Sequence, residues 1–261
     1  MSSREPVLVE RDGAIATVIL NRPERMNALD KAMWMQLGEA IGSLDADESL
    51  RCIVLRGAGG KAFAAGADIA EFARERANAA QARHYGKDGI GAMRTIYECR
   101  HPTVALIEGA CVGGGLLIAS QCDLRICNAS ARFGVPVKNL GLVEAYDELD
   151  GMMRVVGRAA SLELLLEGRI WNAREAYEKG LVNRVLADDA VVDEAYATAR
   201  RISEGAPLAA RWHKKFARRL ADPRPLSPEE FDESYACFDT EDFREGVAAF
   251  LTKRKPVFTG R

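Results

Sequence analysis

Short apolar runs alternate with amphipathic segments along the first half of the chain. The apolar runs at 14–20, 52–56, 104–108 and 124–127 end at glycine, charged or turn residues, which predicts buried β-strands. Between the first two runs, apolar residues of 31–44 recur at helical spacing after Asp30, a residue suited to an N-cap. A polar segment at 71–97 predicts a second helix. Strands that alternate with helices predict an α/β fold.

The last hundred residues are expected to be mainly helical, with no further strand. Asn172 with Glu175 predicts the start of one helix, and Ser227–Glu230 has the capping-box pattern with proline at the first helical position. Thr240 precedes apolar residues at helical spacing, which predicts a last helix.

The composition narrows the class of protein. The 261 residues are 48% hydrophobic and 28% charged, which is typical of a globular chain, and the length predicts one large domain or one domain plus a small appendage. A net charge of −2 indicates no nucleic-acid partner, and Glu108 and glycines interrupt the apolar stretch 103–120, so no membrane span is expected. Six cysteines without C-x-x-C spacing, and no apolar leader near Met1, favour free thiols in the cytoplasm. No His, Cys or carboxylate cluster has metal-ligand spacing, so no metal is expected.

Two segments rich in glycine and alanine follow predicted strands. The first runs from Phe63 to Ile69, and the second runs from Gly109 to Gly115 and leads into a short helix that starts near Gly114. Such residues let a ligand approach the backbone, and N–H groups at a helix start point outward. Two N–H groups that converge on a carbonyl oxygen form an oxyanion hole. The glycines equally suit a tight turn or close helix packing, and they fit neither the dinucleotide pattern nor the P-loop pattern.

The order of these segments resembles the crotonase, or enoyl-CoA hydratase/isomerase, superfamily. The segments that carry the resemblance span nearly the whole chain: Asn21–Leu29, Lys61–Ile69, His101–Gly109, Gly113–Gly115, Cys122–Asp123, Phe133–Pro136, Leu140–Leu142, Ala176–Val182 and Gly246–Pro256. The resemblance implies a spiral of ββα units over 1–200 that binds acyl-CoA, and a C-terminal helical trimerisation region over 201–261. It also implies a homotrimer or a dimer of trimers.

The resemblance further implies an acyl-CoA thioester as substrate, with coenzyme A as part of that substrate and no permanently bound cofactor. By the family pattern, the backbone N–H groups of Ala67 and Gly114 form the oxyanion hole and stabilise a thioester enolate. The coenzyme A arm is expected to contact residues of this subunit or a neighbouring one: Arg25, Asn27, Ala28, Ala65, Ala67, Asp68, Ile69, Ala70, Gly114, Phe250 and Lys253.

The sequence departs from the family where hydratases carry their two glutamates. Those positions, two residues after the glycine triplet and directly after the proline of the F-G-x-P segment, are Leu117 and Val137 here. Neither side chain can move a proton, whereas hydration needs one group to activate water and another to protonate the α-carbon. We therefore expect double-bond isomerisation or another enolate reaction in place of standard hydration.

A second departure lies at Glu144-Ala145-Tyr146-Asp147-Glu148. The pattern of the hydratases that this chain resembles has a proline and a glycine-rich stretch at these positions. Some isomerases of the superfamily carry a single proton-shuttling acid directly after that proline. The aligned position here is Ala145, and a one-residue shift would present Glu144. We expect the acid/base group among Glu144, Asp147 and Glu148, with Tyr146 as a proton donor or pocket wall. The alternative is that these side chains form a solvated loop.

Two other functions stay open. One is a specialised acyl-CoA lyase, hydrolase or decarboxylase whose pocket recognises a polar acyl group. The other is an acyl-CoA-binding protein that has lost the chemistry. Of the residues on the predicted polar helix, His84 and Tyr85 are the candidates to reach the substrate.

Overall fold

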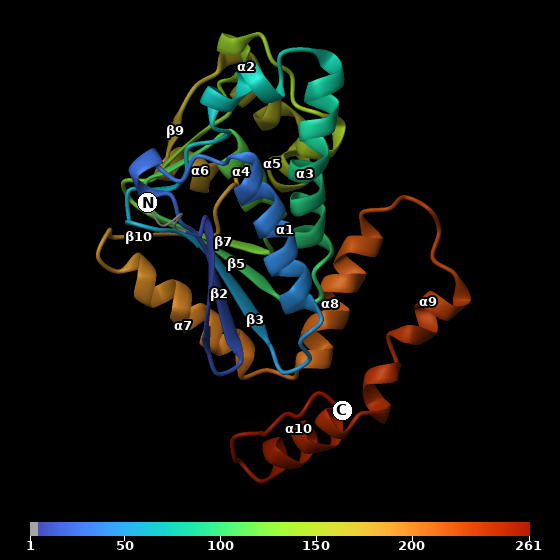
Figure 1. The fold of residues 1–261 in the computed structure, drawn as a ribbon. Coiled ribbons are helices and arrows are strands. Elements are labelled where there is room, and N and C mark those ends of the chain that lie inside the picture. Colours follow the sequence, from blue (N-terminus) through green and yellow to red (C-terminus); the bar gives the residue numbers. More distant parts are fainter. Residues whose placement is uncertain (1–4) are drawn as a thin grey trace.

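Two β-sheets form the framework of the computed structural model, which describes residues 5–261 (Figure 1). The larger sheet has the strand order β1 (Val7–Asp12), β2 (Ile15–Leu20), β3 (Cys52–Gly57), β5 (Thr103–Ile107), β7 (Leu124–Asn128) and β10 (Arg184–Leu186). The smaller sheet has the order β4 (Ala62–Ala64), β6 (Ala110–Val112), β8 (Arg132–Gly134) and β9 (Trp171–Asn172). Neighbouring strands are parallel except for β1 with β2 and β8 with β9.

One structural unit recurs along the chain. Strand β3 is followed by β4, β5 by β6 and β7 by β8, and each pair contributes one strand to each sheet. A helical segment follows every pair: α2 (Phe72–Glu75) with α3 (Ala79–Glu98), then α4 (Gly114–Gln121), then α5 (Tyr146–Glu167). The first half of the chain is therefore a succession of ββα units.

The predicted helices form with the expected caps. Helix α1 (Lys31–Asp45) starts after Asp30, whose Oδ1 accepts the Met33 N–H at 2.8 Å. The polar helix expected over 71–97 is interrupted after α2, because Asn78 caps α3 by accepting the Gln81 N–H. The remaining helices are α6 (Ala173–Glu178), α7 (Val191–Ser203), α8 (Pro207–Leu220), α9 (Pro228–Glu233) and α10 (Glu241–Leu251).

The expectation of no strand in the last hundred residues is wrong. Strand β9 pairs antiparallel with β8, and β10 pairs parallel with β7. These strands have two and three residues, too few for an alternating pattern to be visible in the sequence. Pairing with an existing sheet edge, rather than local propensity, selects their conformation.

The C-terminal helices differ in how they contact the rest of the chain. On α8, Lys214 donates to the His101 carbonyl at 2.9 Å and pairs with Asp123 at 2.7 Å, which fixes this helix to the core. Helices α9 and α10 extend away from the sheets (Figure 1). Helix α10 presents exposed apolar side chains, including Phe243 and Phe250. Within the region expected over 201–261, the extended part begins after Leu220.

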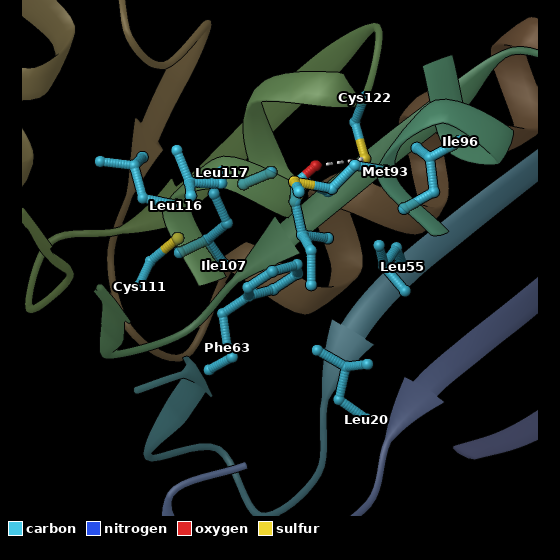
Figure 2. Close-up of a cluster of buried hydrophobic side chains, with 14 of the residues drawn as sticks. Leu20, Leu55, Phe63, Met93, Ile96, Ile107, Cys111, Leu116, Leu117 and Cys122 are labelled. Carbon is cyan, nitrogen blue, oxygen red and sulfur yellow. Dashed lines mark hydrogen bonds between the residues drawn. The ribbon is translucent and has the colours of Figure 1, made fainter. Parts of the chain in front are cut away.

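The main core lies between the larger sheet and helices α1, α3 and α4. Leu20, Leu55 and Phe63 from three strands belong to this cluster, as does Leu116 of α4 (Figure 2). Cys122 at the end of α4 is buried there, and burial raises the pKa of its thiol to about 12. Residues Gly115–Gln121 of α4 are all buried, so this helix is an integral part of the core.

Candidate active site

A cavity of about 160 Å³ opens where the loop after β4 meets the start of α4. Its wall combines backbone of small residues, an apolar surface, one arginine and two glutamates. The lining residues that matter below are Ala67, Gly114, Leu117, Val137, Glu144, Glu148, Phe72 and Arg76.

Ala67 and Gly114 bring two backbone N–H groups to this cavity. Leu29 donates to the Gly66 carbonyl and accepts from the Asp68 N–H, both at 2.8 Å, in a parallel bridge centred on Ala67. In such a bridge the central residue directs its own N–H away from the bonded strand. Gly114 is the first residue of α4, so its N–H has no intrahelical acceptor. Ala67 and Gly114 both line the cavity, and neither backbone N–H is used by the hydrogen bonds just described.

Glycines allow the two backbone segments to approach. Gly66 and Gly113 have φ of 98° and 51°, in the left-handed region that favours glycine. A Cβ on Gly66 would lie 3.2 Å from the Val112 carbonyl oxygen and 3.6 Å from the Gly114 nitrogen. A Cβ on Gly115 would lie 2.4 Å from the Ala64 carbonyl oxygen. The glycine triplet therefore serves both close packing and exposure of the backbone.

Glu144 and Glu148 lie on the same cavity wall, four residues apart at the start of α5. Glu148 accepts the Ala145 N–H at 2.6 Å, which holds its carboxylate at the helix N-terminus. Burial raises the pKa of Glu144 to about 8, and the negative charge of Glu148 and a hydrogen bond between the two side chains add to this effect. The nearby Arg76 guanidinium acts in the opposite direction.

The other two candidates of this segment lie outside the cavity. Tyr146 is 92% exposed. Asp147 lines a separate polar groove with Arg94 and Glu98 of α3. The helix that starts at Tyr146 turns these two side chains away from the cavity, because they are one and two positions beyond the N-cap residue Ala145.

Leu117 and Val137 contribute apolar surface to the cavity. These are the two positions at which the family pattern implies the glutamates of a hydratase. Leu117 is buried in α4, and Val137 begins the short 3₁₀ helix Val137–Leu140.

Among residues 5–261, no group of three or more His, Cys, Asp or Glu side chains is arranged to hold a metal ion. Across the same residues, no helix combines the length and apolar character of a membrane span.

Comparison with known proteins decides which fold family has this geometry. A family model described as enoyl-CoA hydratase/isomerase matches residues 10–261. The chain belongs to the enoyl-CoA hydratase/isomerase family. The expected superfamily membership, the crotonase-like spiral of ββα units and the expectation of an enzyme are thereby confirmed.

Individual members of the family match over almost their full length. A solved structure of an enoyl-CoA hydratase/carnithine racemase from Magnetospirillum magneticum has 54% identity and a TM-score of 0.97, covering 99% of this chain and 97% of that chain. The crotonyl-CoA hydratase of Syntrophomonas wolfei is 33% identical over 98% of this chain and 99% of its own. The short-chain-enoyl-CoA hydratase of Clostridium acetobutylicum is 33% identical over 95% of each chain.

Residues expected to contact coenzyme A in this family member fall into distinct environments. Ala65, Ala67, Ile69 and Gly114 line the cavity, and Arg25 is exposed. Asp68 is half-buried, and burial alone would raise the pKa of its carboxyl group. The hydrogen bond from Arg22 at 2.9 Å acts against this effect, and the pKa is lowered overall. The exposed Ala70 donates its N–H to the Asp68 carboxylate at 3.2 Å.

Asn27 and Ala28 have structural contacts. The Asn27 amide is fully buried; it accepts the Arg22 N–H at 3.0 Å and donates to the Ala58 and Ala62 carbonyls at 3.0 and 2.8 Å. The Ala28 carbonyl accepts from the Arg22 guanidinium at 2.6 Å. These bonds fix the loop before α1 against β4, so Asn27 shapes the site through the backbone.

Phe250 and Lys253 lie at the end of α10, and both are exposed. In Figure 1, α10 and α2 are at opposite ends of the molecule, so these two residues are remote from the cavity of their own chain. Phe250 and Lys253 could therefore contact only a ligand that is bound in the cavity of a neighbouring subunit.

The structure adds Arg76 and Phe72 to the candidate site, and the sequence had not singled out either residue. Arg76 follows Arg74 and Glu75 in a charged run that gives no sign of a cavity residue. His84 and Tyr85 of α3, the two candidates expected to reach the substrate, do not line the cavity. His84 is exposed, and Tyr85 is buried with its ring against the Arg76 guanidinium.

Proposed function

We propose that this enzyme acts on an acyl-CoA thioester and moves a carbon–carbon double bond between the β,γ and α,β positions, with Glu144 as the group that transfers the proton. One observation carries the proposal: the carboxyl group of Glu144 lines the same small cavity as the backbone N–H groups of Ala67 and Gly114. Leu117 and Val137 offer no second proton-transfer group at the positions that hydratases use.

The reaction follows from the placement of these groups. The thioester oxygen accepts hydrogen bonds from Ala67 and Gly114, which makes the α-carbon more acidic. The Glu144 carboxylate removes a proton from the α-carbon of a 3-enoyl thioester, and the electron pair of the C–H bond moves onto the thioester oxygen as a dienolate. Glu144 then returns that proton to the γ-carbon, and the electrons of the dienolate leave the double bond between the α- and β-carbons.

The physical chemistry of the cavity supports each step. A lost oxyanion-hole donor costs about 2.7–4 kcal/mol of transition-state stabilisation, so the two N–H groups supply a large share of the catalysis. A base whose pKa lies near 8 accepts a proton from carbon more readily than an ordinary carboxylate does. The apolar wall of Leu117, Val137 and Leu142 excludes water, which favours proton return over hydration.

Hydration by an unusual pair of groups is the second candidate function. The observation in its favour is that Glu148 lines the cavity beside Glu144, so one carboxylate could activate water while the other delivers a proton. The names of the relatives, crotonyl-CoA hydratase and short-chain-enoyl-CoA hydratase, point in the same direction.

A mass measurement in D₂O separates the candidates. The purified enzyme is incubated with 2-enoyl-, 3-enoyl-, saturated and dicarboxylic acyl-CoAs. Every thioester is then separated by chromatography, and its mass is measured by mass spectrometry. Isomerisation gives a product with altered retention and no added water, hydration adds D₂O, and loss of carbon dioxide or release of coenzyme A indicates a decarboxylase or hydrolase. Glu144→Gln should abolish the isomerisation, whereas the matched surface variant Asp147→Asn should retain it. Binding without turnover of any thioester would favour a non-catalytic acyl-CoA-binding protein.

The same proposal includes assembly into a homotrimer or a dimer of trimers. The exposed apolar face of α10 supports it, as does the distance of Phe250 and Lys253 from the cavity of their own chain. In an assembly these residues would close over the nucleotide part of coenzyme A bound to a neighbour. The six free cysteines support a cytoplasmic location.

A further inference from the structure

Arg76 places a permanent positive charge on the cavity wall. Its guanidinium carbon lies 4.8 Å from the centre of the Phe72 ring and 4.3 Å from the centre of the Tyr85 ring. Tyr85 is itself buried, and its hydroxyl donates to Glu71 at 3.4 Å. Aromatic faces therefore fix the position of the guanidinium, and stacking leaves the N–H groups in its plane available to a partner.

The charge of Arg76 has no acceptor of its own. No residue within 5–261 forms an ion pair or a side-chain hydrogen bond with this guanidinium, and its Nε is buried without a partner. The neighbouring Arg74, by contrast, bonds Glu75 at 2.8 Å, and Arg22 bonds Asp68 at 2.9 Å. The buried Nε is out of a ligand's reach, so the terminal N–H groups of the guanidinium, which also form no ion pair, are the ones available to an anionic ligand in the cavity.

The rest of the cavity limits what that ligand can be. Apart from Arg76, the charged side chains in the wall are Glu144 and Glu148, and the remainder is backbone or apolar surface. The two glutamates disfavour an anion elsewhere in the cavity, so an anionic group is favoured only beside Arg76. The planar guanidinium matches the two oxygens of a carboxylate.

We propose that Arg76 binds a carboxylate at the far end of the acyl chain, so that the preferred substrates are coenzyme A monothioesters of unsaturated dicarboxylic acids. This inference rests on the proposed function, because it names the substrate class of the same cavity. Arg76 is then the residue that determines specificity, and Phe72 and Tyr85 position it. The carboxylate would orient the chain so that its α- and γ-carbons face Glu144.

The test measures binding separately from turnover. Titration calorimetry compares two unreactive six-carbon thioesters, one ending in a carboxylate and one in a methyl group, with the parent, Arg76→Met, Arg76→Lys and the exposed-site control Arg83→Met. The parent and Arg83→Met should bind the carboxylate form roughly 10- to 100-fold more tightly, as expected for a charge-assisted hydrogen bond. In Arg76→Met the ratio should fall to near one, and Arg76→Lys should retain part of it because the charge remains.

Several results would overturn the inference. A parent enzyme that binds the methyl form as tightly as the carboxylate form excludes it, as does an Arg76→Met variant that keeps the preference. Equal loss of both affinities in Arg76→Met, with an unchanged thermal unfolding midpoint, assigns Arg76 to general pocket shape instead. Because neither thioester can react, a failure of isomerisation leaves these binding ratios interpretable. Turnover of 3-enoyl thioesters with and without the terminal carboxylate then tests whether the preference extends to kcat/KM.

Discussion

Glu144 and Glu148 lie four residues apart at the start of α5 and line the same cavity. The negative charge of Glu148 adds to burial in raising the pKa of Glu144, because a like charge nearby favours retention of the proton. Glu148 accepts the Ala145 N–H at 2.6 Å, and both glutamates are half-buried. The raised pKa of Glu144 makes its behaviour with pH measurable.

The first prediction concerns the rate. If Glu144 acts as the base, kcat/KM for isomerisation should rise with pH and level off above about 8, where its carboxyl group is ionised. Glu148→Gln removes a negative charge and should move this rise to lower pH; burial keeps the pKa of Glu144 above the ordinary value of 4.5. A pH–rate profile of both proteins measures the shift. An identical profile in the variant would contradict the coupling.

A second prediction concerns stability. The folded protein keeps the Glu144 proton up to about pH 8, while the unfolded chain releases it near 4.5. This stabilising contribution is therefore complete below the lower value and is lost as pH rises through the upper one. Since one pKa unit corresponds to about 1.4 kcal/mol, the parent should lose a few kcal/mol relative to Glu144→Gln over this range. Urea unfolding at several pH values checks it, and parallel curves for the two proteins would refute it.

The start of α4 gives a third prediction. A Cβ on Gly114 would lie 3.1 Å from both Leu29 Cδ1 and Trp34 Cζ2, which are buried and cannot move freely. Gly114→Ala should therefore displace the N–H and lower kcat by up to about 100-fold. Gly91→Ala on α3 is the matched control, because nothing lies within 4 Å of its added Cβ, and kcat should not change. Equal activity of both variants would contradict the prediction that catalysis depends on the exact position of the Gly114 N–H.

Asn27 provides a fourth prediction. Asn27→Gly should destabilise the protein by about 2–4 kcal/mol, because it removes three hydrogen bonds of a buried side chain while permitting the φ of 55° at this position. The affinity of the folded variant for coenzyme A should stay close to that of the parent. Denaturant unfolding and calorimetry measure the two quantities. Normal stability with lost affinity would instead assign Asn27 a direct contact with the ligand.

The fifth prediction concerns assembly. Light scattering should give a mass of about three or six times 28.5 kDa for the parent. Phe243→Glu on the exposed face of α10 should reduce this mass, because a charge in an apolar interface is costly. Met35→Glu on α1 is the control, since Met35 is exposed to a similar extent outside the C-terminal helices. A parent that runs as a monomer would exclude the proposed trimer.

Much of the framework follows from the sequence because its signals are local. Apolar runs such as Cys52–Gly57 and the Asp30 cap mark their elements directly, and the glycine triplet marks the start of α4. Strands β9 and β10 escape detection because partners distant in the sequence select them. The interruption between α2 and α3 depends on the Asn78 cap, which competes with continuation of the helix.

The candidate site also has a part that the sequence predicts and a part that depends on tertiary packing. The segment Glu144–Glu148 is visible in the sequence as a run of acidic residues, but the sequence does not show which of its side chains face inward. Residues 144 and 148 face the cavity and residues 146 and 147 do not, because the helix begins at Tyr146. Arg76 is harder to find, since its environment depends on the packing of Phe72 and Tyr85.

In the proposed oxyanion hole, the donors at Ala67 and Gly114 are main-chain atoms, each next to a left-handed glycine, at 66 and 113. No exchange of a side chain at 117, 137, 144 or 148 removes them. A lineage with this fold can therefore lose or relocate its proton-transfer groups one at a time while the polarised carbonyl persists. Each intermediate along such a path still activates the same bond, so a new reaction need not evolve from an inert protein.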